Sequence, residues 1–170
     1  WILQECQREW RAIGGVHDIA ELIDLAGSAP STGLLINPDE PQFAQPGGMV
    51  GRITNALRAQ DSGIGALSEG EVVRVILESL AARYARGIAD LSALTGSPAR
   101  QLNLVGGGSR NALLCQLTAD AVGVPVLAGP VEASVLGSLL AQLEIMDTLD
   151  PEDRNAVIAA SARTVRYEPA

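Results

Sequence analysis

Short apolar segments alternate with amphipathic ones over the last third of the chain, and this alternation limits the fold more than any other feature. Residues 102–105 and 123–127 are predicted strands, and residues 110–122 and 131–145 are predicted helices. Strands that alternate with helices favour a βαβ unit with parallel strands and a right-handed crossover. Pro125 fits such a sheet only at an edge or at the start of a strand. Two predicted strands are too few for a stable sheet, so we expect the chain to be part of a larger domain.

The sequence before this unit is predicted to be mostly helical. Residues 69–95 form the longest amphipathic stretch, with Ser68 and Glu71 as a capping box and Gly96 as its end. Shorter periodic stretches predict helices over 1–12, 17–26, where Asp18 lies at the positive end of the helix dipole, and 49–60. The apolar residues 33–37 predict a short strand, followed by a loop rich in Pro and Gly over 38–48. Residues 150–162 predict a last helix capped by Asp150, and 164–170 show no pattern.

Charge and composition exclude several classes of function. The formal net charge is −8, which is opposite to that of a nucleic-acid-binding domain. All twelve basic residues are Arg, so there is no Lys for a Walker-type phosphate loop or for a Schiff base. Apolar runs are too short for a membrane span, and no signal peptide precedes the charged residues that follow Trp1. Because the chain starts at Trp1 inside a periodic segment, we expect it to be a fragment of a longer protein.

Isolated polar residues give no catalytic constellation. Cys6 and Cys115 lie far apart and are predicted to be buried free thiols of a reducing, cytoplasmic protein. No residue is predicted to bind a metal. His17, the pair Asp39 and Glu40, and Asp120 are interpreted as surface or loop residues, with an interface as the second interpretation for the pair.

The loop Gly106-Gly107-Gly108 joins a predicted strand to a predicted helix. Three glycines allow backbone angles that other residues avoid, and they let a ligand approach the main chain. The free N–H groups and positive dipole end of the next helix favour an anion there. Ser109 or Asn111 could cap that helix or bind a base edge. Taken alone, this loop is also compatible with a tight connection that binds nothing.

Three segments around this loop resemble the C-terminal domain of FGGY carbohydrate kinases. These segments are residues 105–111, 116–121 and 128–137, and the sequence Ala-Gly-Pro-Val-Glu-Ala-Ser is similar to the rhamnulokinase branch. The opening Trp1–Cys6 and the loop 36–43 are similar too, so the resemblance runs in order from Trp1 to about Leu149. Residues 71–78 fit the second FGGY signature except at Val75, which favours a divergent branch such as rhamnulokinase over glycerol or xylulose kinase.

The resemblance implies a partial actin-like, RNase H-like ATPase domain of the α/β class, helix-rich and ending in a βαβα unit. Residues 1–149 would be the latter part of the ATP-binding domain, and 150–170 a terminal helix and tail. The implied cofactors are ATP and Mg²⁺, and the implied partners are a sugar and the N-terminal kinase domain, with a homodimer as a further possibility. Site residues are carried over only on the nucleotide side: Gly106, Gly107, Gly108, Asn111 and Gln4. Glu132 and Ala133 would begin a helix that lines the adenine pocket.

No catalytic residue is carried over, because the segments that hold the family's base and phosphate loop have no counterpart here. The implied reaction of the parent enzyme is transfer of the ATP γ-phosphoryl group to L-rhamnulose, giving L-rhamnulose 1-phosphate. Two alternatives stay open: another FGGY sugar kinase of the xylulose or glycerol type, and a non-catalytic nucleotide-binding or interaction module of the same fold.

Overall fold

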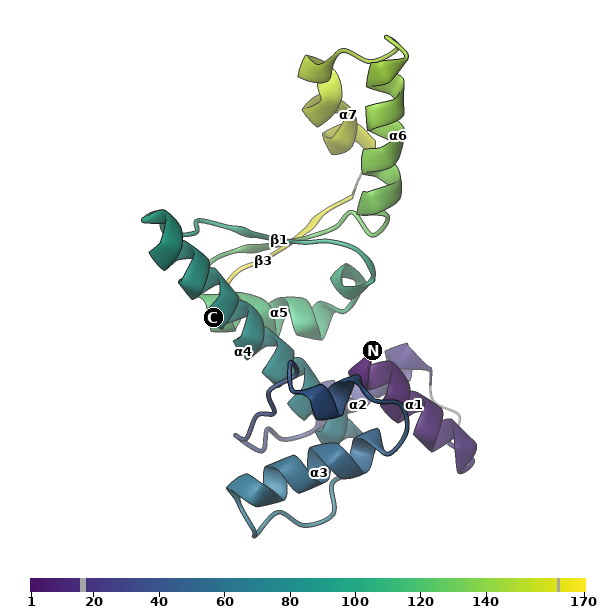
Figure 1. The fold of residues 1–170 in the computed structure, drawn as a ribbon, viewed down its shortest axis with the longest axis vertical. Helices are drawn as coiled ribbons and strands as arrows, with labels where there is room; N and C mark the ends of the chain where they lie inside the picture. The colour runs from purple at the N-terminus through teal and green to yellow at the C-terminus, as the bar shows by residue number, and fades with distance from the viewer. Residues whose placement is uncertain (16–17, 162) are drawn as a thin grey trace. The chain divides into compact units, whose positions relative to one another are not determined.

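The structure is a computed structural model that describes residues 1–15, 18–161 and 163–170. The position of His17 lies outside the described residues. The chain divides into two compact units, Trp1–Gly87 and Ile88–Ala170, and each is described by itself (Figure 1). Among the described residues, no helix has the length and apolar character needed to cross a membrane.

The first unit consists of helices around an apolar core. It contains α1 (Ile2–Ala12), α2 (Ile19–Ser28), the 3₁₀ turn η1 (Pro41–Ala44), α3 (Met49–Gln60) and most of α4 (Glu69–Thr95). Apolar side chains at helical spacing on these elements are fully buried, which explains why the periodic stretches form helices. The core residues are Cys6, Leu22, Phe43, Met49, Ile53, Leu57, Val72, Val73 and Ile76. Gly70 allows α4 to approach α2 closely, because a Cβ there would lie 2.8 Å from the Leu25 carbonyl oxygen.

The predicted start and end of α4 are confirmed, whereas the helix predicted over 17–26 is α2, which runs from Ile19 to Ser28. The Asp18 carboxylate accepts from the Glu21 N–H at 2.8 Å, and Glu21 accepts from the Asp18 N–H at 3.0 Å, so α2 starts with a capping box. Ser68 and Glu71 make the same reciprocal bonds at the start of α4. Gly96, with φ +67°, follows the last residue of α4.

The strand predicted over 33–37 is wrong. This segment is extended but pairs with no strand among the described residues. Instead, the Ile36 N–H donates to the Ser79 hydroxyl of α4 at 3.0 Å, and the buried Ile36 side chain joins the core. The Ser79 hydroxyl thus accepts the backbone hydrogen bond that the carbonyl of a neighbouring strand would accept in a sheet.

The second unit is built on a small mixed sheet of strand order β1-β2-β3. β1 (Leu102–Leu104) and β2 (Val126–Ala128) are parallel, as predicted, with α5 (Ala112–Val122) between them in sequence. Pro125 directly precedes β2, and its carbonyl accepts from the Leu102 N–H at 2.9 Å, so it occupies the strand start that its chemistry allows. Helix α5 lies along one face of the sheet (Figure 1). Its buried residues are Leu114, Cys115, Thr118 and Ala119.

The end of the chain differs from the prediction. Residues 164–170 were predicted to lack structure, but Val165–Tyr167 forms β3, antiparallel to β2. Three residues are too few for a period-2 pattern to be read, so the strand is specified by its pairing with β2. The helix predicted over 150–162 is divided into η3 (Pro151–Asp153) and α7 (Arg154–Ser161), with the Asp150 cap confirmed by a 3.0 Å bond from the Glu152 N–H.

Candidate nucleotide-binding loop

The glycine loop begins where β1 ends. Gly106 has φ +77°, in the left-handed region that favours glycine, and its N–H donates to the Pro130 carbonyl at 3.1 Å. On the same side, the Gly129 N–H donates to the Leu104 carbonyl at 2.8 Å. The segment around 129–130 therefore holds both the last residue of β1 and the first glycine of the loop.

Within the loop, Ser109 closes the turn and does not cap the helix. Both its N–H and its hydroxyl donate to the Gly106 carbonyl, at 3.1 and 2.7 Å. These bonds shape residues 107–110 into the 3₁₀ turn η2 (Gly107–Arg110). The helix predicted from residue 110 consequently starts two residues later, at Ala112.

Gly107 and Gly108 differ in the space around them. A Cβ on Gly107 would meet nothing within 4 Å, whereas one on Gly108 would touch Leu104 and Leu114 side chains at 3.5 and 3.9 Å. Gly107 is exposed, so its main chain is open to a ligand. Gly108 instead lies close to the apolar layer between β1 and α5.

Asn111 is the N-cap of α5. Its side-chain oxygen accepts from the Leu114 N–H at 2.9 Å, and the residue is 8% exposed. The capping alternative of the sequence analysis is therefore realised by Asn111. Because the oxygen is engaged, the side-chain amide nitrogen is the group left to donate to a ligand.

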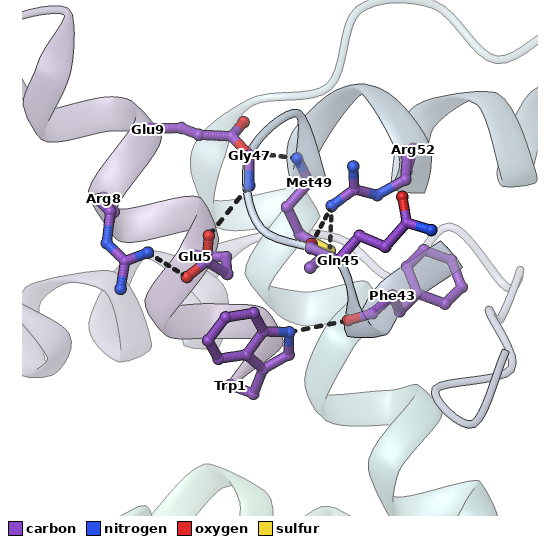
Figure 2. A network of polar contacts seen from close by, with 9 residues as sticks. All are labelled: Trp1, Glu5, Arg8, Glu9, Phe43, Gln45, Gly47, Met49 and Arg52. Carbon is purple, nitrogen blue, oxygen red and sulfur yellow. Dashed lines mark hydrogen bonds and ion pairs between the residues drawn. The ribbon is translucent and has the colours of Figure 1, made fainter. Parts of the chain in front are cut away.

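Gln4 lies on α1, in the first unit, and its side chain is exposed. Trp1, Glu5 and Glu9 fix α1 to the segment 43–50 by polar contacts (Figure 2). Trp1, at the N-cap of α1, donates its indole N–H to the Phe43 carbonyl at 2.9 Å, and the buried Glu5 carboxylate accepts from the Gly47 N–H at 3.2 Å. Glu5 also pairs with Arg8.

Glu9 caps α3 from outside that helix. Its carboxylate accepts from the Met49 and Val50 N–H groups, the latter at 3.3 Å. The N-cap residue of α3 itself is Gly48, which has no side chain to offer. Trp1, Glu5 and Glu9 are spaced four residues apart and thus lie on one face of α1, forming what we call the α1 ladder. The negative charge of Glu9 also suits the positive end of the α3 dipole.

The remaining polar residues singled out from the sequence are engaged elsewhere. Asp39 pairs with Arg83 of α4, and Asp120 accepts from the Gln116 side chain at 2.8 Å and from the Ala170 N–H at 2.9 Å. Both are exposed, as predicted for surface residues. Cys6 and Cys115 are buried free thiols, also as predicted. Burial raises the pKa of the Cys6 thiol to about 12, with a further contribution from the Glu9 charge.

Among the described residues, no group of three or more His, Cys, Asp or Glu side chains could hold a metal ion. Mg²⁺ at a nucleotide is commonly held by only one or two carboxylates together with the phosphates.

Comparison with known proteins decides the family. Residues 1–144 match the model of the FGGY family of carbohydrate kinases, C-terminal domain. The chain belongs to the FGGY family of carbohydrate kinases. Its FGGY C-terminal domain includes α1, the glycine loop and nearly all of α6 (Ala133–Ile145).

A curated relative and a solved structure are similar to this FGGY domain. A rhamnulokinase from Bacteroides thetaiotaomicron is 37% identical over 170 residues, which are 99% of this chain and 34% of that protein. The crystal structure of xylulose kinase from Rhodospirillum rubrum, an actin-like ATPase fold, matches with a TM-score of 0.65 at 23% identity over 99% of this chain and 33% of that one. The predicted fold class is confirmed. The chain spans about a third of the length of both relatives.

Sequence reasoning missed the α1 ladder. Glu5 and Glu9 were available as a signal, because two carboxylates four residues apart share a helix face with the apolar Ile2 and Cys6. A buried carboxylate needs donors, and the Pro-Gly-Gly turn before α3 offers N–H groups that no side chain of its own can satisfy.

Proposed function

We propose that this chain is the nucleotide-binding part of a rhamnulokinase, which transfers the γ-phosphoryl group of ATP to L-rhamnulose. The observation that carries the proposal is the 37% identity to a rhamnulokinase over nearly the whole chain. The departure from the second FGGY signature at Val75 supports the same branch. The xylulose kinase likeness supports the fold alone, at 23% identity.

The glycine loop is the proposed nucleotide contact. The open main chain at Gly107 and the N-terminus of α5 favour an anionic group, and Asn111 keeps an amide N–H for the adenosine side. Gly106 and Gly108 shape the loop, and Gln4 on α1 is a second proposed contact with the nucleotide. The division into 1–149 as part of the ATP domain and 150–170 as its tail is retained as part of the proposal.

In the proposed reaction, a hydroxyl oxygen of the sugar bonds to the γ-phosphorus while the bond from that phosphorus to the ADP oxygen breaks. The hydroxyl proton passes to a base, which we expect in the N-terminal domain of the kinase. The share of this chain is positioning: it binds the nucleotide that leaves as ADP.

Calorimetric titration of the chain with ATP and ADP tests the loop assignment. We expect binding by the wild-type chain and at least a tenfold weaker affinity for Gly107→Glu, because a carboxylate would repel the phosphates and fill the open approach. Gly51→Glu is the matched control, since Gly51 is also exposed with no atom within 4 Å of a Cβ. An absence of heat with the wild type, or equal affinity of the two variants, contradicts the proposal.

A coupled assay for ADP tests the division of labour. We expect no turnover of L-rhamnulose by this chain alone, because the base and the sugar contacts are expected outside it. Turnover above background would refute that division. Should the full reading frame contain no actin-like half upstream, the non-catalytic module would replace the kinase as the proposed function.

A further inference from the structure

Residues 163–170, which we call the β3 segment, lie next to the backbone that supports the glycine loop. Val165 at the start of β3 is paired with Ala128 at the end of β2. The next residue of that strand, Gly129, has φ +113°, and a Cβ there would lie 2.6 Å from the Arg163 carbonyl oxygen. Glycine at this position therefore lets the β3 segment approach the backbone closely.

The same backbone holds the glycine loop on its other side. The Gly129 N–H donates to the Leu104 carbonyl at the end of β1, at 2.8 Å, and the Pro130 carbonyl accepts from the Gly106 N–H at 3.1 Å. Gly106 begins the turn in which the open main chain of Gly107 is the proposed nucleotide contact. A displacement of this backbone would therefore reach the loop through two hydrogen bonds.

Side chains of α5 fasten the far end of the β3 segment (Figure 1). The Gln116 amide donates to the Glu168 carbonyl at 2.8 Å, and the Asp120 carboxylate accepts from the Ala170 N–H at 2.9 Å. Gln116 also donates to Asp120 at 2.8 Å, so the two side chains act as one anchor. Because a strand of three residues forms few hydrogen bonds of its own, this anchor adds to its docking.

Tyr167 gives the β3 segment a second connection to the loop. Burial raises the pKa of its hydroxyl, and the charge of an ionised Cys115 adds to the rise, so the two groups lie close enough to interact. The Cys115 sulfur lies 3.8 Å from the Ser109 carbonyl oxygen and 4.0 Å from that of Gly108. The thiol thus contacts the turn η2 directly and lies near the β3 segment.

We propose that the β3 segment is a positioning element for the nucleotide. Its docking on β2 and α5 fixes the backbone at 129–130, and this backbone fixes the glycine loop in the shape that receives the phosphates. The family match ends at residue 144, before β3, and so assigns no role to this segment. The inference rests on the proposed function for its ligand, but the connection between the β3 segment and the loop can be measured without a ligand.

Amide hydrogen exchange of the double variant Gln116→Ala with Asp120→Ala tests this connection. The variant removes the anchor on α5 and leaves the glycine loop itself unchanged. We expect the amides of β3 and those of Gly106 and Gly129 to exchange about tenfold faster than in the wild-type chain, because release of the β3 segment frees the backbone that supports the loop.

Two single variants serve as controls. Arg166→Ala removes an exposed side chain that pairs with Glu168 inside the same segment, so the anchor on α5 remains and exchange should stay unchanged. Asp120→Asn keeps an acceptor oxygen for the Ala170 N–H and should restore slow exchange.

Calorimetric titration with ADP connects the β3 segment to the ligand. We expect the double variant to bind ADP about threefold more weakly than the wild-type chain, and ADP should in turn slow the exchange of the β3 amides, because coupling between two sites is reciprocal. The thermal unfolding midpoint of the double variant should equal that of Arg166→Ala, which separates a loss of positioning from a loss of folded protein.

Three results overturn the proposal: faster exchange in β3 without faster exchange at Gly106 and Gly129, no acceleration in the double variant, or equal ADP affinity of the double variant and the wild-type chain. The last result leaves the proposed function intact while this inference fails. If the wild-type chain binds no ADP but the amides of β3 and the loop accelerate together, the proposed function fails while the support of the loop by the β3 segment holds.

Discussion

The two units are almost equal in length but differ in how they treat apolar side chains. Of the buried apolar residues described, sixteen lie in Trp1–Gly87 and six in Ile88–Ala170. The large exposed apolar residues show the opposite distribution, with five in the first unit and eight in the second. The first unit thus buries most of its large apolar side chains, whereas the second leaves more of them exposed than it buries.

Most of the buried core that stabilises the chain therefore lies in the first unit, whereas the proposed nucleotide-binding loop lies in the second. In the first unit, the helices bury apolar side chains against one another, and the α1 ladder supplies hydrogen-bond acceptors for the backbone N–H groups of Gly47, Met49 and Val50. In the second, a three-stranded sheet with three-residue strands carries the glycine loop. Small sheets of this kind depend on what packs against them. The proposed nucleotide contact of the loop thus lies in the unit that buries fewer apolar side chains.

The largest expected effect is that of Phe43→Ala in the first unit. Phe43 is 1% exposed, so the substitution leaves a cavity and should lower the free energy of unfolding by about 3–5 kcal/mol. Leu94→Ala in the second unit should change it by less than about 0.5 kcal/mol, because Leu94 is 84% exposed. Urea denaturation measures both.

Amide hydrogen exchange of the Phe43→Ala variant tests whether the two units unfold separately or together. Faster exchange in α1 and α3, with β1 to β3 unchanged, would mean that the units open separately. Equal acceleration in both would break the comparison, because the units would then unfold together.

A smaller effect is expected from Glu5→Ala in the α1 ladder. The substitution removes a buried acceptor from the Gly47 N–H, which should cost about 1–3 kcal/mol. Arg8→Ala removes only the exposed partner of the same carboxylate and should cost less than about 1 kcal/mol. Similar losses for the two variants, measured by thermal unfolding, would show that the ladder adds nothing to the core.

The smallest expected effect on stability comes from the Cys6 thiol, and it appears only at alkaline pH. The thiol has a pKa of about 12 in the folded chain and about 8.5 when unfolded, so between these values the unfolded chain releases a proton that the folded chain retains. Stability from this group is therefore complete below about pH 8.5 and is lost as pH rises, with a slope of up to about 1.4 kcal/mol per pH unit.

Cys6→Ala should flatten this alkaline decline when unfolding midpoints are compared from pH 8 to 10. With no Lys in the chain, few other groups titrate there. Burial also raises the pKa of the Cys115 thiol in the second unit, so Cys115→Ala is the matched variant. If Cys115→Ala flattened the alkaline decline more than Cys6→Ala, this would contradict the expectation that the pKa of Cys6 is raised further than that of Cys115.

How much the sequence predicts depends on whether the cause is local. Helices α3 and α4 were predicted to the residue because their apolar period and end signals are contained in the segments themselves. The failures at 33–37 and 165–167 share one cause. In both, the partner of the backbone is distant: Ser79 for the first, and β2 for the second.

The same holds for the candidate site. The glycine loop was predicted as a turn, and its 3₁₀ geometry follows from the Ser109 bonds to Gly106, which are local. The support of Gly106 by Pro130 is not local and had no signal in the sequence. The roles of Gly106, Gly107, Gly108, Asn111 and Gln4 toward a nucleotide stay predictions.

The cap that Glu9 gives to α3 has a consequence for the order in which the chain folds. The N–H groups in the first turn of α3 donate to Glu9, about forty residues earlier in the sequence. These bonds can form only after the chain between the two helices has closed into a loop. We expect α3 to be frayed at its start until α1 docks, so that the two helices form in one step. A polypeptide shortened by its first nine residues would then lose order around residues 45–50 as well as losing a helix.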